Sequence, residues 1–162
     1  MRSSRGFAYL ALVLAVSANQ IGLASEVLTK AETKHAISEI RSAYAAFNRG
    51  DIEAAVSMLD ANVEWSEPVE FPGGGEFHGI DQAKRYLSQS RAGADRVISE
   101  PEQFIPTGDK IVVFVRARVL PKGTDSWQEI RLADVYTFHH DKATAMHAFA
   151  DRKEALRWAQ HE

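Results

Sequence analysis

The sequence has no cysteine, no stripe of basic residues and no hydrophobic run long enough to cross a bilayer. Without cysteine, the chain cannot form disulfide bonds, use a thiolate in catalysis or bind metal through sulfur. Its 19 Lys and Arg residues stand against 22 Asp and Glu residues, which gives a net charge of −3. This balance argues against nucleic acid and anionic membranes as partners, and we expect no stable membrane insertion.

The N-terminal segment differs in composition from the rest of the chain. Two arginines begin it, residues 7–16 are nearly all apolar, and small residues follow. This layout is typical of a signal peptide, because an apolar run of about ten residues is too short to span a bilayer. Cleavage after Ala24 or after Ala18 fits the small-x-small rule. We expect residues 1–24 to direct export to the periplasm or medium and residues 25–162 to form one domain; a retained anchor or leader is the alternative.

The order of predicted elements indicates an α+β domain. Capping-box spacing at Thr29 and Glu32 begins a helix that Gly50 ends, and Asp51 caps a second helix that continues to Leu59. The further predicted elements are a strand at 63–66, an irregular segment at 67–78, a helix at 81–91, strands at 96–104 and 110–120, a hairpin at 127–151 and a C-terminal helix at 152–158. A curved sheet wrapped around the N-terminal helices would make a cone with one open end.

The hairpin carries the residue that breaks the hydrophobic pattern. Alternation places five residues of its first strand on one face, namely Ile130, Leu132, Asp134, Tyr136 and Phe138. A carboxylate in such a row must be paired, protonated or facing a cavity. We expect Asp134 to form the floor of a pocket. The alternative is a buried ion pair with Arg116 or Arg118, which share a strand face with Phe114.

Several segments resemble the nuclear transport factor 2-like superfamily, in particular its ketosteroid isomerase-like and SnoaL-like branches. They are Ala-Ala-Phe-Asn-Arg-Gly-Asp at 45–51, Val-Glu-Trp-Ser-Glu-Pro at 63–68, and the last two strands at 134–138 and 146–149. The resemblance covers about residues 33–159. It implies a cystatin-like α+β roll with a curved mixed or antiparallel sheet, a pocket for a small-molecule ligand, and a homodimer.

The resemblance also assigns roles to two carboxyl groups. Glu67, just before Pro68, falls where the isomerases have the aspartate that shuttles the proton. Asp134 falls where they have a protonated acid that donates a hydrogen bond to the oxyanion. The oxyanion tyrosine of the isomerases is replaced here by Ala43. Tyr44 is displaced by about 100° around the helix, so we expect its hydroxyl to point elsewhere.

Other residues are second candidates. For proton transfer, Tyr44 and His147 join Glu67 and Asp134, although a half-buried structural histidine is the alternative for His147. Ligand contacts are predicted for five residues: Arg116, Phe114, Trp65, Phe138 and Met146. The outer face of the hairpin, with Trp127, Arg131, Val135 and Thr137, is predicted to pack on a second copy of the chain.

The sequence gives no indication of a cofactor or a metal. Glu67, Glu70 and His78 match no metal-ligand spacing, so we expect none bound there. The sequence and the resemblance together predict an exported acid–base isomerase, hydrolase or cyclase acting on a small apolar carbonyl or hydroxyl compound. A non-enzymatic ligand-binding or interaction module of the same fold is the alternative.

Overall fold

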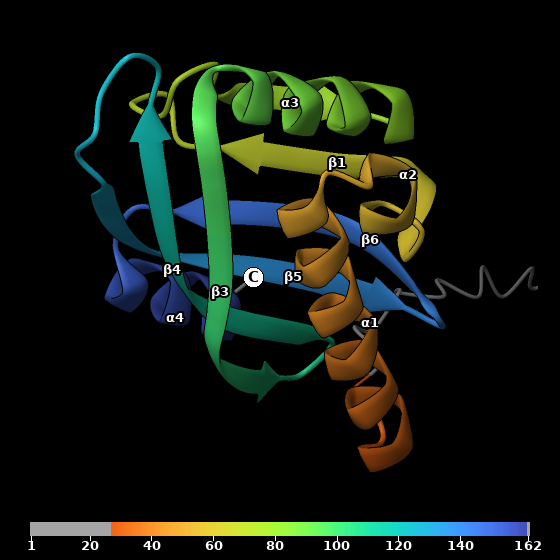
Figure 1. Cartoon of the computed structure of the whole chain (residues 1–162). Helices are drawn as coiled ribbons and strands as arrows, with labels where there is room; N and C mark the ends of the chain where they lie inside the picture. The colour runs from red at the N-terminus through yellow and green to blue at the C-terminus, as the bar shows by residue number, and fades with distance from the viewer. Residues whose placement is uncertain (1–26, 162) are drawn as a thin grey trace, which may run out of the picture.

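The chain forms helices at its N-terminus, then a six-stranded sheet, then a final helix (Figure 1). This is a computed structural model that describes residues 27–161, so the predicted signal peptide at 1–24 lies outside the described residues. The elements are α1 (Lys30–Arg49), α2 (Ile52–Ala55), β1 (Leu59–Glu67), β2 (Gly75–His78), α3 (Ile80–Ala92), β3 (Ala94–Thr107), β4 (Lys110–Pro121), β5 (Gln128–His139), β6 (Lys142–Phe149) and α4 (Arg152–His161). Within this part of the chain, no helix is both long and apolar enough to cross a membrane.

The strands pair in the order β2-β1-β6-β5-β4-β3, and the sheet is mixed. β1 and β6 run parallel, whereas every other neighbouring pair is antiparallel. The sheet curves around α1, α2 and α3 on its concave side, while α4 covers part of the opposite side (Figure 1). The predicted α+β roll with a curved mixed sheet and a C-terminal helix is therefore confirmed.

Local capping signals set the limits of the N-terminal helices. The backbone N–H of Thr29 donates to the Glu32 carboxylate at 2.8 Å, and the Glu32 N–H donates to the Thr29 hydroxyl at 3.3 Å. Gly50 ends α1 with φ 84°, a conformation that favours glycine. The Asp51 side chain caps α2 as predicted. The predicted continuation of α2 to Leu59 is wrong, because Leu59 already pairs with Ala143 of β6 as the first residue of β1.

The segment 67–78 is more regular than predicted. Its last four residues form β2, which pairs with β1 and places Phe77 opposite Trp65. The preceding turn is closed by two backbone hydrogen bonds, from Phe71 N–H to the Pro68 carbonyl and from Gly74 N–H to the Phe71 carbonyl. A Cβ at Gly74 would lie 1.9 Å from the Pro68 oxygen, so this turn requires glycine at that position.

Alternation along the sheet produces two separate hydrophobic cores. Ile111, Val113 and Val115 of β4 face α1, α2 and α3, whereas Val112 faces α4. Val135 is also buried beneath α4. The prediction that Val135 belongs to a surface packing on a second copy is therefore wrong, since a helix of the same chain covers it.

Candidate functional site

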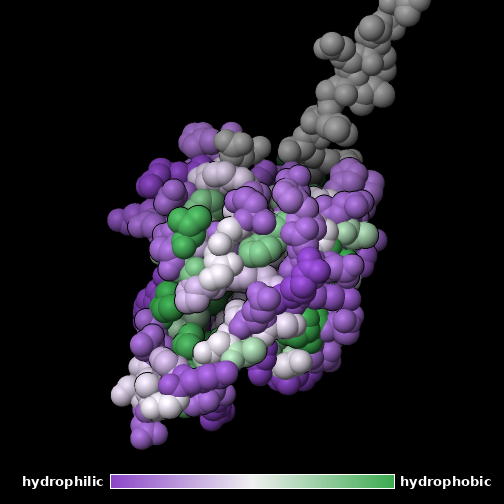
Figure 2. Space-filling model, turned by 90° about the horizontal axis from the view of Figure 1, so that it is seen from above, coloured by the Kyte–Doolittle hydropathy of each residue, from purple (hydrophilic) through white to green (hydrophobic). Residues whose placement is uncertain are grey.

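A cavity of about 170 Å³ lies between the concave side of the sheet and the N-terminal helices. Most of its lining is aliphatic and aromatic. The polar side chains that line it are Tyr44, Glu67, Tyr86, Ser90, Ser99, Asp134 and Tyr136. On the face of the molecule that is seen from above, apolar and neutral residues gather around a hollow, and hydrophilic residues surround them (Figure 2). An apolar cavity with a few converging polar groups is the usual form of a small-molecule site.

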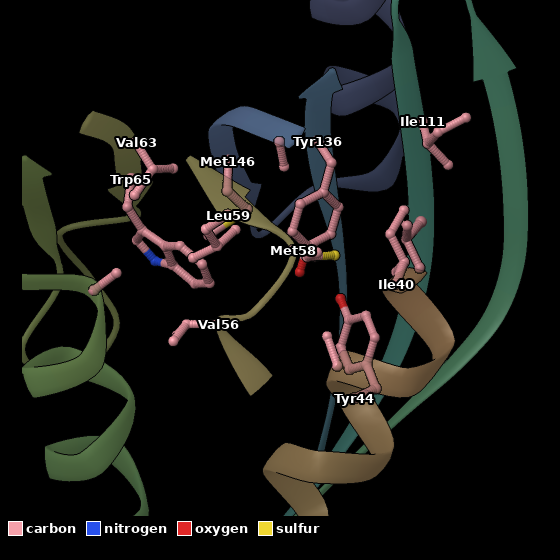
Figure 3. Close-up of a cluster of buried hydrophobic side chains, with 14 of the residues drawn as sticks. Ile40, Tyr44, Val56, Met58, Leu59, Val63, Trp65, Ile111, Tyr136 and Met146 are labelled. Atoms are coloured by element: carbon pink, nitrogen blue, oxygen red, sulfur yellow. The ribbon is translucent and has the colours of Figure 1, made fainter. Parts of the chain in front are cut away.

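Asp134 lies in this cavity on β5, opposite Val113 of β4. Only 9% of its surface is exposed, and its Oδ2 accepts a hydrogen bond from the hydroxyl of Tyr44. Tyr136 lies on the same face of β5 and is hydrogen-bonded to Tyr44. The hydroxyl groups of Tyr44 and Tyr136 point toward each other from α1 and β5 (Figure 3). The three side chains thus form a buried polar network.

The prediction that the Tyr44 hydroxyl points elsewhere is wrong. Ala43 and Tyr44 are both buried and both line the cavity, because the buried face of α1 is wide enough to include the two neighbouring positions. A step of about 100° around the helix therefore moves the tyrosine to the flank of that face without removing it. From there the hydroxyl of Tyr44 donates a hydrogen bond to Asp134.

Burial raises the pKa of Asp134 to about 6, and the hydrogen bond from Tyr44 partly opposes this rise. The same burial, together with the nearby Asp134 carboxylate, raises the pKa of the Tyr44 and Tyr136 hydroxyls well above their usual values. Both tyrosines are therefore proton donors throughout the neutral range. Asp134 is largely ionised at neutral pH, and Tyr44 donates to it.

Glu67 is the second carboxyl group in the cavity. It ends β1 on the face of Trp65, whose indole Nε1 donates to Glu67 Oε1 at 2.8 Å. Burial is the main reason that the pKa of Glu67 rises to about 8; repulsion from Asp134 adds to this, and hydrogen bonds from Trp65 and Tyr86 oppose it. The pKa of Tyr86 is raised, first by burial and then by Glu67. Near neutral pH, Glu67 thus holds a proton while Asp134 lacks one.

The alternative of a buried pair between Asp134 and an arginine is wrong. Arg116 and Arg118 lie on the opposite side of the sheet, because the pleat of β4 turns Val113 and Val115 toward the cavity instead. Arg116 Nη2 lies 2.9 Å from Glu100 Oε2, and Arg118 Nη2 lies 3.6 Å from the same oxygen.

The residues predicted from the sequence to contact a ligand lie on both sides of the sheet, and only one of them lines the cavity. Trp65 lines the cavity, whereas Phe138 and Met146 are buried in the main core away from it. Phe114 and Arg116 lie outside the cavity on the opposite side of the sheet, where Phe114 belongs to the core beneath α4 and the Arg152 guanidinium lies 4.9 Å from its ring centre.

His147 does not line the cavity either. Its ring lies 4.5 Å from that of Trp158 in α4, while the preceding Met146 belongs to the main core. This position beside α4 matches the structural alternative for the histidine rather than a role in the pocket.

Several cavity residues were not singled out from the sequence. The position of Tyr136 in the cavity could have been predicted, because Tyr136 lies two residues after Asp134 on the same strand face. The contact between Tyr86 and Glu67 joins α3 to β1, and the pairing of distant elements gives no local signal in a sequence. The same reason applies to Ser90 and Ser99. Among residues 27–161, no three His, Asp or Glu side chains are grouped so that they could hold a metal ion.

The sequence profile of the SnoaL-like domain matches residues 40–146, which is more than half of the chain. The protein therefore belongs to the SnoaL-like domain family. Comparison with curated proteins gives no match.

Solved structures with similar folds agree with this assignment. One is an NTF2-like protein of unknown function from Burkholderia pseudomallei, with 24% identity, TM-score 0.66 and coverage of 76% of this chain and 95% of that chain. Another is TerC co-crystallized with polyporic acid, with 26% identity, TM-score 0.65 and coverage of 77% and 98%. A third, from Catenulispora acidiphila, has a ketosteroid isomerase-like fold and is in complex with trimethylamine, with 14% identity, TM-score 0.62 and coverage of 68% and 83%.

Proposed function

We propose that this protein catalyses proton transfer next to the carbonyl group of a small, largely apolar compound. The observation that carries the proposal is the presence of two carboxyl groups in one apolar cavity, with pKa values of about 6 for Asp134 and about 8 for Glu67. Two acids held at different pKa values in one site supply a base and an acid at the same pH.

The proposed reaction uses these groups in opposite senses. The Asp134 carboxylate takes a proton from the carbon beside the carbonyl, and the electron pair of that C–H bond forms the C=C bond of an enol. Glu67 donates its proton to the carbonyl oxygen, which carries the developing charge. Where the compound also carries a C=C bond next to that carbon, the enol is a dienol. Asp134 then returns the proton to the far carbon of the dienol, Glu67 recovers its proton from the oxygen as the C=O bond re-forms, and the C=C bond has moved, which completes an isomerisation. These roles are the reverse of those that the family resemblance implies, and the order of the two pKa values supports the reversal.

The size and lining of the cavity support a ligand with about one ring, or an aliphatic group of similar size, inside the cavity. A cavity of roughly 150 Å³ is known to hold benzene, and the cavity here is of about that volume. The co-crystals of TerC with polyporic acid and of the Catenulispora protein with trimethylamine support small-molecule binding by proteins of this fold.

Deuterium exchange tests the proposed reaction without knowledge of the natural substrate. The protein is incubated with small cyclic and aromatic ketones in deuterated water, and incorporation at the carbon beside the carbonyl is followed by mass spectrometry. We expect catalysed exchange that saturates with ketone concentration. Saturable binding without exchange would contradict proton transfer and leave the alternative, a ligand-binding or interaction module with the same cavity.

We also propose export and self-association. The signal-peptide layout of residues 1–24 supports export. Trp127, which is 42% exposed and whose ring centre lies 5.7 Å from the Arg118 guanidinium, supports a homodimer formed on the side of the sheet that α4 partly covers. The mass of the mature protein in solution tests both, because removal of the first 24 residues and a doubled mass are separately measurable; an uncleaved chain or a monomer at high concentration would contradict the respective proposal.

A further inference from the structure

The cavity has an unbalanced electrostatic character. Two carboxyl groups line it, and no Lys, Arg or His from the described part of the chain does so. The ion pairs among residues 27–161 lie elsewhere, and none of them includes Glu67 or Asp134. A buried carboxylate is normally paired with a cation, since burial of an isolated charge is costly. Here the protein itself supplies hydroxyl groups to Asp134 but no positive charge.

The nearby arginine does not fill this role. Arg91 follows Ser90, a cavity residue, but its Nη1 donates to the backbone carbonyl of Phe47 at 2.7 Å. It also approaches the carbonyl groups of Asn48 and Val97. Its guanidinium is therefore held by the backbone at the side of the cavity and does not line it.

The rest of the lining is rich in aromatic rings. Six aromatic side chains contribute to it: Tyr44, Phe47, Trp65, Phe71, Tyr86 and Tyr136. The faces of aromatic rings attract cations, most strongly where water is excluded, and cavities of this composition suit alkylated ammonium groups. An anion would meet Asp134 and the electron-rich ring faces together. The charge and the rings thus favour the same kind of ligand.

We propose that the compound bound in this cavity is cationic, with a small tertiary or quaternary ammonium group on an apolar frame. This inference rests on the proposed function for the location of the site and for the carbonyl or hydroxyl group of the same compound. The ammonium group lies among the aromatic rings and is balanced by the Asp134 carboxylate. The ammonium group supplies the positive charge that the lining of the cavity lacks.

The proposal has a consequence for pH dependence. A cation in the cavity favours the ionised form of Glu67, so binding releases a proton in part, and the affinity rises as the pH passes through the pKa of Glu67, about 8. An uncharged ligand that accepts a hydrogen bond from protonated Glu67 shows the opposite dependence. A quaternary ammonium probe is suited to this comparison, because its own charge does not change with pH.

Three probes of nearly the same shape test the inference by calorimetric titration of the intact chain. The cation is choline. The uncharged probe is 3,3-dimethylbutan-1-ol, in which a tert-butyl group replaces the trimethylammonium group, and the anion is 3,3-dimethylbutanoate. We expect choline to bind at least about tenfold more tightly than the uncharged probe and the anion to bind most weakly. The preference for choline should grow between about pH 6.5 and about pH 8.5, because Glu67, with a pKa of about 8, becomes ionised over this range.

Variants show whether the carboxyl groups cause the preference. Asp134→Asn should reduce the affinity for choline at both pH values, whereas Glu67→Gln should reduce it at about pH 8.5 and not at about pH 6.5, where Glu67 is already uncharged. Neither variant should weaken binding of the uncharged probe, and folding is verified by circular dichroism. Glu64→Gln is the matched control, because Glu64 is an exposed carboxyl group on the same strand as Glu67. We expect Glu64→Gln to bind choline as the unmodified protein does.

Other outcomes separate this inference from the proposed function. Equal or tighter binding of the uncharged probe would overturn the cationic ligand, whereas catalysed exchange with neutral ketones would still support proton transfer. Failure of all three probes to bind at millimolar concentration would also overturn the inference. Absence of exchange combined with selective binding of choline would overturn the proton-transfer reaction and leave a binding site for cations.

Discussion

Asp134→Asn is expected to reduce catalysed deuterium exchange by about 10³-fold, within the range that a positioned acid or base contributes. Asparagine has nearly the shape of aspartate, and its side-chain oxygen can still accept the hydrogen bond from Tyr44. The cavity therefore keeps its form, while the group that takes the proton is lost. The measurement is the initial rate of incorporation at the carbon beside the carbonyl, with equal concentrations of folded protein.

The matched control for this variant is Asp141→Asn. Asp141 is exposed in the turn between β5 and β6 and does not line the cavity, so the same chemical change should leave exchange unaltered. Exchange by Asp134→Asn at the rate of the unmodified protein would show that another group takes the proton.

Glu67→Gln is expected to make the protein more stable than the unmodified chain at high pH and to change its stability little near pH 4.5. The pKa of Glu67 rises from 4.5 to about 8 on folding, so the folded state holds its proton more tightly than the unfolded state does. The stabilisation from this proton is fully present below about pH 4.5 and is lost as the pH rises to about 8. Glutamine carries no charge at any pH, and its oxygen can still accept from Trp65.

Urea unfolding at several pH values between about 4.5 and 9 measures this effect. The difference in unfolding free energy between variant and unmodified protein should grow by a few kcal/mol across that interval. Glu64→Gln, in which an exposed carboxyl group on β1 is lost, should show no such growth. Parallel curves for the Glu67 variant and the unmodified protein would mean that Glu67 is not held protonated by the fold.

Much of the fold was predictable from local signals. Capping residues at Thr29, Asp51 and Gly50 set the ends of the first helices, as the hydrogen bonds and the φ of Gly50 confirm. Strict alternation along β5 placed Asp134 on the same buried face as Leu132 and Tyr136, and all three line the cavity. Such predictions succeed because the period of a strand or helix fixes the relative direction of side chains within one element.

The errors concern relations between elements. The opposite sides of β4 could be told apart from the sequence, but which side faces the helices could not, so Arg116 and Phe114 were assigned to the pocket. Tyr44 was placed by its rotation around α1 alone, and the width of the buried face of that helix decided its direction instead. The buried position of Val135 beneath α4 likewise depends on where the last helix packs. No periodicity within one segment contains this information.

The two carboxyl groups and the stability of the fold are connected. Burial raises the pKa of both carboxyl groups, whereas the hydrogen bond from Tyr44 favours the ionised form of Asp134. The cost of ionising buried groups opposes folding as the pH rises. Retention of two such groups in an apolar space is expected where the local environment serves a reaction or a ligand. The same reasoning connects the proposed proton transfer to the proposed cationic ligand, since each uses the charge that the protein leaves unbalanced.

The most direct test of the account is a titration of the two carboxyl groups by carbon NMR in labelled protein, with the signals assigned through Glu67→Gln and Asp134→Asn. The interacting pair should lose its protons in two steps, with apparent pKa values near 6 and near 8, the first mainly at Asp134 and the second mainly at Glu67. Two transitions below about pH 5, the ordinary range of aspartate and glutamate, would contradict the account.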